Sequence, residues 1–159
     1  MDNQSQELIF IHSSEGEIPY KWAAGRYGSH FLTEIRDNGK FWGVRCPSCQ
    51  KVYIPPRRVC GPCFAEMTEW VELGEEGILT GFSIVDYGFL DPDTGKARPV
   101  PYTTIYVKLD GADTGFCHSL DETDLSKIKV GMRVRAVFKP KEKREGMPTD
   151  IEYFTKISD

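Results

Sequence analysis

The sequence predicts a mainly β protein with an N-terminal arm and helical segment (residues 1–38), a rubredoxin-like zinc ribbon (39–76) and a C-terminal five-stranded OB-fold barrel (77–159). Two observations predict this class. Two C-x-x-C pairs stand close together in the first half, and five runs rich in β-branched and aromatic residues fill the second half. A short segment with an acidic start separates the third run from the fourth, which is the order of elements in an OB-fold.

The N-terminal part is expected to begin as a loose arm over residues 1–18, because this stretch is polar and shows no sustained period. Residues 19–38 are predicted to be helical. Pro19 suits the start of a helix, and Asn38-Gly39 supplies a left-handed stop. Four apolar side chains are spaced so that they partly share one face: Trp22, Phe31, Leu32 and Ile35.

The two C-x-x-C pairs are Cys46/Cys49 and Cys60/Cys63, with ten residues between them. Two knuckles of this kind bring four thiolates around one ion, an arrangement that zinc favours. A four-sulfur shell has no open position, so the metal is expected to be structural. A rubredoxin-type iron centre uses the same ligands and stays an alternative, as do two disulfides or four unrelated core thiols.

The residues that follow the two pairs are Gln50 and Phe64. Glycine would adopt a left-handed backbone at these points more cheaply, so both knuckles are expected to carry some strain.

Short strands are expected on both sides of the first knuckle, at residues 41–45 and 52–54, and a third strand at 67–73. The barrel strands are expected at 78–87, 102–109, 115–120, 133–139 and 150–157, with a short helix at 125–128. The fourth barrel strand alternates clearly: Val134, Ala136 and Phe138 should face the core while Arg133, Arg135 and Lys139 face outward.

Composition restricts the function. The chain has 159 residues, with 24 acidic and 20 basic side chains, so it has no general attraction for polyanions. It shows neither a secretory signal nor an apolar run long enough to span a membrane, and free cysteines suit a reducing compartment, so a cytoplasmic location is expected.

The fifth cysteine, Cys117, is predicted to be a buried strand thiol. No Ser/His/Asp set, carboxylate pair or phosphate-binding glycine loop indicates an independent active site.

Several motifs in one order resemble a known family, the zinc-ribbon plus OB-fold proteins that accompany acyl-CoA thiolases and related condensing enzymes. The resemblance is carried by residues 39–49 (GKFWGVRCPSC), 54–57 (IPPR), 60–63 (CGPC) and 130–135 (VGMRVR), together with Trp70, Gly77 and Pro101-Tyr102. Within this family the chain is similar to the small subunits of thiolases for bulky acyl-CoA esters, such as the benzoylsuccinyl-CoA thiolases. Gln50 and Phe64 depart from the glycines of the family knuckles.

The resemblance implies a non-catalytic accessory subunit in a hetero-oligomer, beside a thiolase-like subunit that supplies the reactive cysteine and the base. It also implies an acyl-CoA ester shared with that subunit, for which an aromatic β-ketoacyl-CoA is the specific candidate. Phosphate groups of the ester would meet basic side chains, for which the candidates are Arg57, Arg58, Lys139 and Lys141.

Two other functions stay open. Tyr102, Tyr106 and Lys108 would share one face of a barrel strand, as in a single-stranded nucleic-acid-binding OB-fold, although the acidic total argues against this. An iron-loaded ribbon would instead transfer electrons.

A docking surface is also expected, because four aromatic residues are a large apolar load for a small module: Trp22, Phe31, Phe41 and Trp42. Packing of the helix on the ribbon would explain the same residues without a partner.

Overall fold

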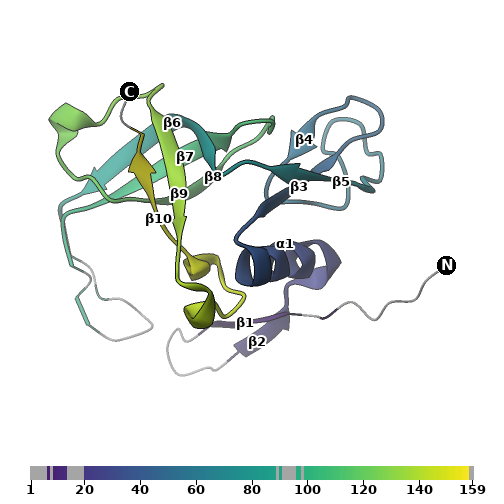
Figure 1. Ribbon diagram of the computed structural model, residues 1–159, viewed down its shortest axis with the longest axis horizontal. Helices are drawn as coiled ribbons and strands as arrows, with labels where there is room; N and C mark the ends of the chain where they lie inside the picture. The colour runs from purple at the N-terminus through teal and green to yellow at the C-terminus, as the bar shows by residue number, and fades with distance from the viewer. Residues whose placement is uncertain are drawn as a thin grey trace.

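The computed structural model describes residues 7, 9–13, 20–88, 90, 96–97 and 99–157. A two-stranded sheet, a helix, a three-stranded ribbon sheet and a closed barrel follow one another along the chain (Figure 1). The mainly β class and the OB-fold barrel are therefore confirmed.

The N-terminal region differs from the expectation. β1 (Phe10–Ser13) pairs with β2 (Tyr20–Ala23) as an antiparallel hairpin, so residues 20–23, including Trp22, form a strand rather than the start of a helix. The helix begins only at Gly25, whose φ of 71° separates the two elements. Part of the predicted loose arm is thus ordered; residues 1–6, 8 and 14–19 lie outside the described chain.

Helix α1 (Gly25–Asn38) ends where Gly39 adopts φ 63° and donates its N–H to the Ile35 carbonyl at 3.1 Å. This left-handed end is the stop that the Asn-Gly pair predicted. The buried face of α1 carries Ser29, Phe31, Leu32 and Ile35. The Ser29 hydroxyl accepts the Ile9 N–H at 3.1 Å, which ties the start of the described chain to the helix.

The ribbon sheet has the order β4 (Val52–Tyr53), β3 (Phe41–Arg45), β5 (Glu69–Leu73), and all its pairs are antiparallel. Helix α1 packs on it through aromatic rings: Tyr27 stacks on Trp70 at 5.4 Å, and the His30 ring lies 4.1 Å from Trp70, centroid to centroid. Burial in this contact lowers the pKa of His30.

The barrel closes in the order β6 (Glu76–Val85), β7 (Tyr102–Leu109), β8 (Phe116–Leu120), β10 (Ile151–Lys156), β9 (Arg133–Phe138), with β9 pairing again with β6. The β8–β10 pair is parallel. The element between β8 and β9 is the 3-10 helix η1 (Leu125–Lys127). On β9, Val134 and Ala136 are buried and Arg135 is exposed, as its alternation predicted.

One apolar core crosses from the ribbon into the barrel, and Phe41 lies at its centre. Phe41 is fully buried, and its ring is 5.2–6.5 Å from four other phenylalanine rings: Phe31, Phe116, Phe138 and Phe154. The docking expectation is therefore wrong for Phe31 and Phe41, whose side chains the fold itself buries. Because this core joins all three parts, the boundaries at 38/39 and 76/77 stay predictions.

Hydrogen bonds also join the ribbon to the barrel. The Val52 N–H donates to the Asp113 carboxylate, and the Ile54 N–H donates to the Thr114 hydroxyl, each at 2.8 Å. Asp113 and Thr114 lie in the turn between β7 and β8. The edge strand of the ribbon is thus held against a barrel turn, so its backbone groups are not left unsatisfied.

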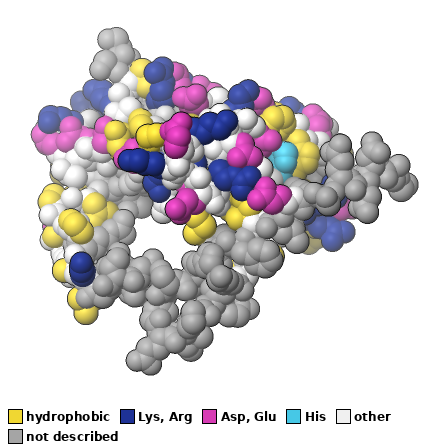
Figure 2. Space-filling view, turned by 60° about the horizontal axis from the view of Figure 1, so that its bottom comes forward, with side chains coloured by type: hydrophobic (Ala, Val, Ile, Leu, Met, Phe, Trp, Pro, Cys, Tyr) yellow, Lys and Arg dark blue, Asp and Glu magenta, His cyan; other side chains and the backbone are white. Residues whose placement is uncertain are grey.

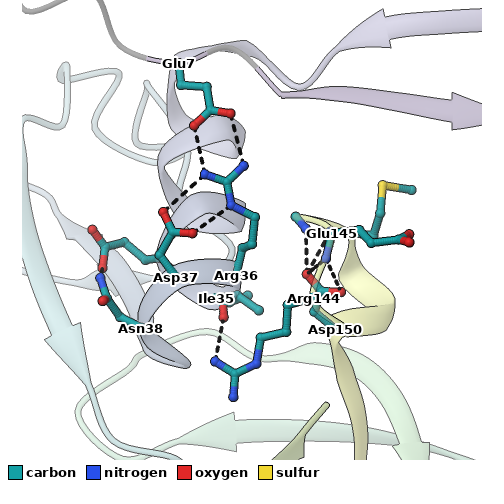
Figure 3. A network of polar contacts seen from close by, with 11 residues as sticks. Glu7, Ile35, Arg36, Asp37, Asn38, Arg144, Glu145 and Asp150 are labelled. Carbon is teal, nitrogen blue, oxygen red and sulfur yellow. Dashed lines mark hydrogen bonds and ion pairs between the residues drawn. The ribbon is translucent and has the colours of Figure 1, made fainter. Parts of the chain in front are cut away.

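The connection between β9 and β10 contains two 3-10 helices, η2 (Lys141–Lys143) and η3 (Pro148–Asp150), and packs beside α1 (Figure 3). Arg144 donates to the Lys139 carbonyl at 2.7 Å and to the Ile35 carbonyl at 3.4 Å. The buried Asp150 carboxylate accepts the N–H groups of Glu145, Gly146 and Met147. These bonds fix the connection in one conformation.

We expect Phe41→Ala to lower the free energy of unfolding by about 3–5 kcal/mol, because it leaves a cavity where helix, ribbon and barrel meet. Urea denaturation of the zinc-loaded protein measures this change. Leu125→Ala is the control: Leu125 is 65% exposed, and its truncation should change stability by less than about 0.5 kcal/mol. A Phe41 variant as stable as the Leu125 variant would contradict the shared core.

Candidate metal centre

The two knuckles have the same backbone hydrogen bonds. In the first, Cys46 N–H donates to Lys51 O and Gln50 N–H donates to Cys46 O, both at 2.9 Å. In the second, Cys60 N–H donates to Ala65 O at 3.0 Å and Phe64 N–H donates to Cys60 O at 2.9 Å. The chain thus turns back tightly at each C-x-x-C pair, and the two thiols of each pair point the same way.

Both knuckles contain the left-handed residue that the sequence indicated, with φ 62° at Gln50 and φ 56° at Phe64. The Gln50 side chain partly compensates, because its Nε2 donates to the Pro47 carbonyl at 2.9 Å. Phe64 instead extends into solvent with 83% of its surface exposed. An exposed aromatic side chain thus occupies a backbone conformation that glycine adopts more easily.

The sulfur atoms of Cys46, Cys49, Cys60 and Cys63 all lie within 4.8 Å of one another, and Cys49 and Cys60 are 3.8 Å apart. A tetrahedral zinc ion with Zn–S bonds of about 2.3 Å needs sulfur–sulfur distances of about 3.8 Å. The cluster therefore fits a four-sulfur metal shell. Two of the ligands, Cys46 and Cys60, are buried and the other two are partly buried, so all four positions of the ion would be taken by protein.

The electrostatics of the thiols also favour a bound cation. A hydrogen bond from Tyr53, whose hydroxyl lies 3.4 Å from the Cys60 sulfur, lowers the pKa of Cys60 to about 6. Hydrogen bonding to Cys49, together with burial, raises the pKa of Cys63 to about 12. Four thiolates this close would repel one another, and a divalent ion offsets that repulsion.

The centre is sealed by a second, smaller apolar cluster around Val44, Tyr53 and Met67. Tyr27 on α1 donates its hydroxyl to the Met67 carbonyl at 2.7 Å, so the helix also supports the knuckles. The role of Tyr53 was missed from the sequence, where no signal distinguished it from other strand tyrosines.

The structure does not gather the four basic residues suggested for CoA-ester binding. Arg57 lies over the Tyr53 ring at 4.7 Å, and Arg58 forms a 3.0 Å ion pair with Glu66, both on the ribbon. Lys139 directly follows β9 and Lys141 begins η2, so both belong to the connection between β9 and β10 rather than to the ribbon. A single ligand could contact both the arginine pair and the lysine pair only if it reached two separate parts of the surface.

Cys117 is exposed, so its assignment as a buried strand thiol was wrong. In β8 it lies opposite Tyr106 on the outer face, while its neighbour His118 points inward and packs against Phe154 at 5.9 Å. The sequence run around Cys117 is apolar but too short to show which of its alternate residues face the core.

With this geometry in view, comparison with known proteins identifies the family. Residues 33–68 match the model of the ChsH2 rubredoxin-like zinc ribbon domain, and residues 70–139 match that of the ChsH2 C-terminal OB-fold domain. The chain belongs to this ChsH2-type, or DUF35, family. The metal of the four-cysteine centre is accordingly a structural zinc ion, held in a rubredoxin-like ribbon.

A DUF35 domain-containing scaffold protein of Methanocaldococcus jannaschii is 31% identical over 100 residues, which are 61% of this chain and 66% of that protein. The match thus spans slightly less than two thirds of this relative. Two solved structures share the fold. A DUF35 protein of unknown function from Sulfolobus solfataricus has 20% identity, covers 71% of this chain and 78% of its own, and superposes with a TM-score of 0.55.

The second structure is described as an Ltp2-ChsH2 (DUF35) aldolase. It has 21% identity, covers 80% of this chain and 93% of its own, and superposes with a TM-score of 0.56. The zinc-ribbon and OB-fold prediction is confirmed by these matches, while the likeness to benzoylsuccinyl-CoA thiolases stays a prediction.

Within the described residues, the single α-helix is too short and too polar to cross a bilayer.

The lower face of the molecule in Figure 1 is turned forward in Figure 2, where acidic and basic side chains alternate without a continuous basic area.

The purified chain should contain one zinc ion, and Cys60→Ser should lose it and unfold the ribbon, because three thiolates leave the shell open. Metal analysis with circular dichroism tests this, and Cys117→Ser, which removes the exposed thiol, should retain full zinc. Stoichiometric iron, or an unmetallated protein that stays folded under reducing conditions, would contradict the assignment.

Phe64→Gly should stabilise the zinc-loaded protein by about 0.5–1 kcal/mol, because the left-handed backbone is relieved and no buried contact is lost. Gln50→Gly should gain less, since it also removes the bond to Pro47. Denaturant titration of the two variants gives the comparison. Destabilisation by Phe64→Gly would mean that the ring packs on the fold.

Proposed function

We propose that this protein is a non-catalytic accessory subunit of a thiolase-type enzyme that acts on an acyl-CoA ester. The observation that carries the proposal is the closed zinc centre: all four positions of the ion are taken by cysteine sulfur, so the metal can hold the fold but cannot bind or activate a substrate. The family supports the same conclusion, since one relative is named a scaffold protein and another is described with an aldolase.

The partner in this proposal is a thiolase-like catalytic subunit that brings its own cysteine nucleophile and base. Docking is assigned to exposed apolar residues rather than to the buried Phe31 and Phe41. On the ribbon these are Phe64, 83% exposed, and Val59, 43% exposed, with the Arg58–Glu66 ion pair beside them. An apolar centre with a charged rim is the usual composition of a protein interface.

The acyl-CoA ester would be shared with the catalytic subunit, and an aromatic β-ketoacyl group is the specific candidate. Arg57 and Arg58 on the ribbon, and Lys139 and Lys141 after β9, are proposed as contacts for its phosphates. Guanidinium groups pair with phosphate in a bidentate manner, and Arg58 can exchange its exposed partner Glu66 for such a ligand.

Single-stranded nucleic-acid binding is the second candidate, favoured by Tyr106, which is 48% exposed on the outer face of β7. Stacking of bases on such rings is the common mode of OB-folds. The net charge of −4 and the mixed charges of Figure 2 do not support binding of a long polyanion.

Co-purification from the native host, followed by reconstitution with the companion subunit, tests the proposal. We expect the catalytic subunit alone to cleave its β-ketoacyl-CoA slowly or with weak substrate affinity, and this chain to restore both. Equal activity without this chain would overturn the proposal. Tight binding of a single-stranded oligonucleotide by this chain alone at physiological salt would favour the second candidate.

A further inference from the structure

The seam of the barrel between β8 and β10 is paired over only a short length. β8 and β10 pair at Phe154 opposite Leu120, whereas β7 and β8 pair from Val107–Phe116 to Thr103–Leu120. Before the Phe154–Leu120 position the two strands diverge, and a cavity of about 550 Å³ opens between β8 and the start of β10. We call this the seam cavity; it is lined by Tyr102, Thr104, Cys117, His118, Ser119, Lys139, Thr149, Ile151 and Glu152.

The walls of the seam cavity are more apolar than polar, and a few hydrogen-bonding groups stand among them. Lys139 places an ammonium group there, with its Nζ 3.4 Å from the Thr149 hydroxyl, and Thr104 lines the same space. Ser119 also lines it, but its hydroxyl proton is donated to the Glu152 carbonyl. None of the ion pairs between described residues includes Lys139. Glu152 is the one acid among the described lining residues, and it is exposed.

The walls of the cavity are held rigidly. Ser119 donates its hydroxyl to the Glu152 carbonyl at 3.3 Å, which bridges the diverging strands. Lys139 N–H bonds to the Asp150 carbonyl at 2.9 Å, and the buried Asp150 carboxylate fixes residues 145–147 (Figure 3). The backbone of Lys139 and Thr149 is therefore held by an ordered connection, so little backbone entropy is lost when their side chains bind a ligand.

We propose that the seam cavity binds a phosphate-bearing small molecule, with the phosphate at Lys139 and Thr149 and the remainder against Tyr102 and Ile151. An ammonium group that forms no ion pair with a described residue, beside the threonines Thr104 and Thr149, is suited to an anion. A volume of about 550 Å³ is within the range of small-molecule sites. The phosphate site is inferred from the geometry of this chain alone. The further assignment, that the phosphate belongs to an acyl-CoA ester, rests on the proposed function.

The test uses the zinc-loaded chain with inorganic pyrophosphate and, in a second arm, coenzyme A. Calorimetry should show binding of pyrophosphate that is weakened by about tenfold or more in Lys139→Gln, a loss typical of one charge-assisted contact. Lys108→Gln, which removes an exposed lysine of β7 outside the lining, should bind as the parent does.

Cys117 gives a second measurement, because its thiol lines the cavity while the other four thiols are bound to zinc. Pyrophosphate should slow alkylation of Cys117 by iodoacetamide, measured by mass spectrometry, in the parent but not in Lys139→Gln.

No binding of pyrophosphate at millimolar concentration, or equal binding by the parent and Lys139→Gln, would overturn the seam cavity as a phosphate site. Binding of pyrophosphate without binding of coenzyme A would keep the site and remove the acyl-CoA assignment. Failure of reconstitution with a thiolase subunit would leave both measurements unaffected, so the two proposals fail separately.

Discussion

Sharing of one divalent cation by four cysteine thiolates is the interaction on which the rest of this structure depends. The sulfur atoms lie within 4.8 Å of one another, and burial together with hydrogen bonding to Cys49 raises the pKa of Cys63, so a cation is favoured where four thiolates would otherwise repel one another. The ribbon sheet is small, with β4 only two residues long, so its own hydrogen bonds could not hold it. Zinc binding energy is thus folding energy here.

The effect of the metal reaches the barrel through β3. This strand ends at Arg45, directly before the ligand Cys46, and begins at Phe41, which lies at the centre of the shared core. The hydrogen bonds of Val52 and Ile54 to Asp113 and Thr114 add a second connection. Because Phe41 packs on barrel side chains such as Phe154, the orientation of the ribbon relative to the barrel is set by packing rather than by a flexible linker.

The parts of the fold that were predicted from sequence rest on short-range patterns. The spacing of Cys46, Cys49, Cys60 and Cys63 is local, and the alternation along β9 is contained in one strand. The parts that were not predicted depend on contacts distant in sequence. Trp22 was assigned to a helix because its β1 partner strand lies in a stretch without a period, and Phe41 was assigned to the surface because its barrel neighbours are up to 113 residues away.

Cys117 shows that a single position can also depend on tertiary structure: only its register opposite Tyr106 decides that it faces outward.

The basic residues are a further case. Arg57, Arg58, Lys139 and Lys141 were grouped by their charge, but the fold places the two pairs on different elements. Sequence identifies side chains that can bind phosphate, whereas tertiary structure decides which of them share a cavity.

The placement of the remaining features argues for a protein that binds rather than reacts. The metal is enclosed by its ligands, and the aromatic ring of Phe64 is exposed on a strained knuckle next to it. Strain persists where surrounding structure over-determines the backbone, and the zinc ion does so at this turn. The same closed centre that excludes chemistry at the metal can therefore hold an apolar side chain in a fixed exposed position, which is what a subunit needs in order to dock on another protein.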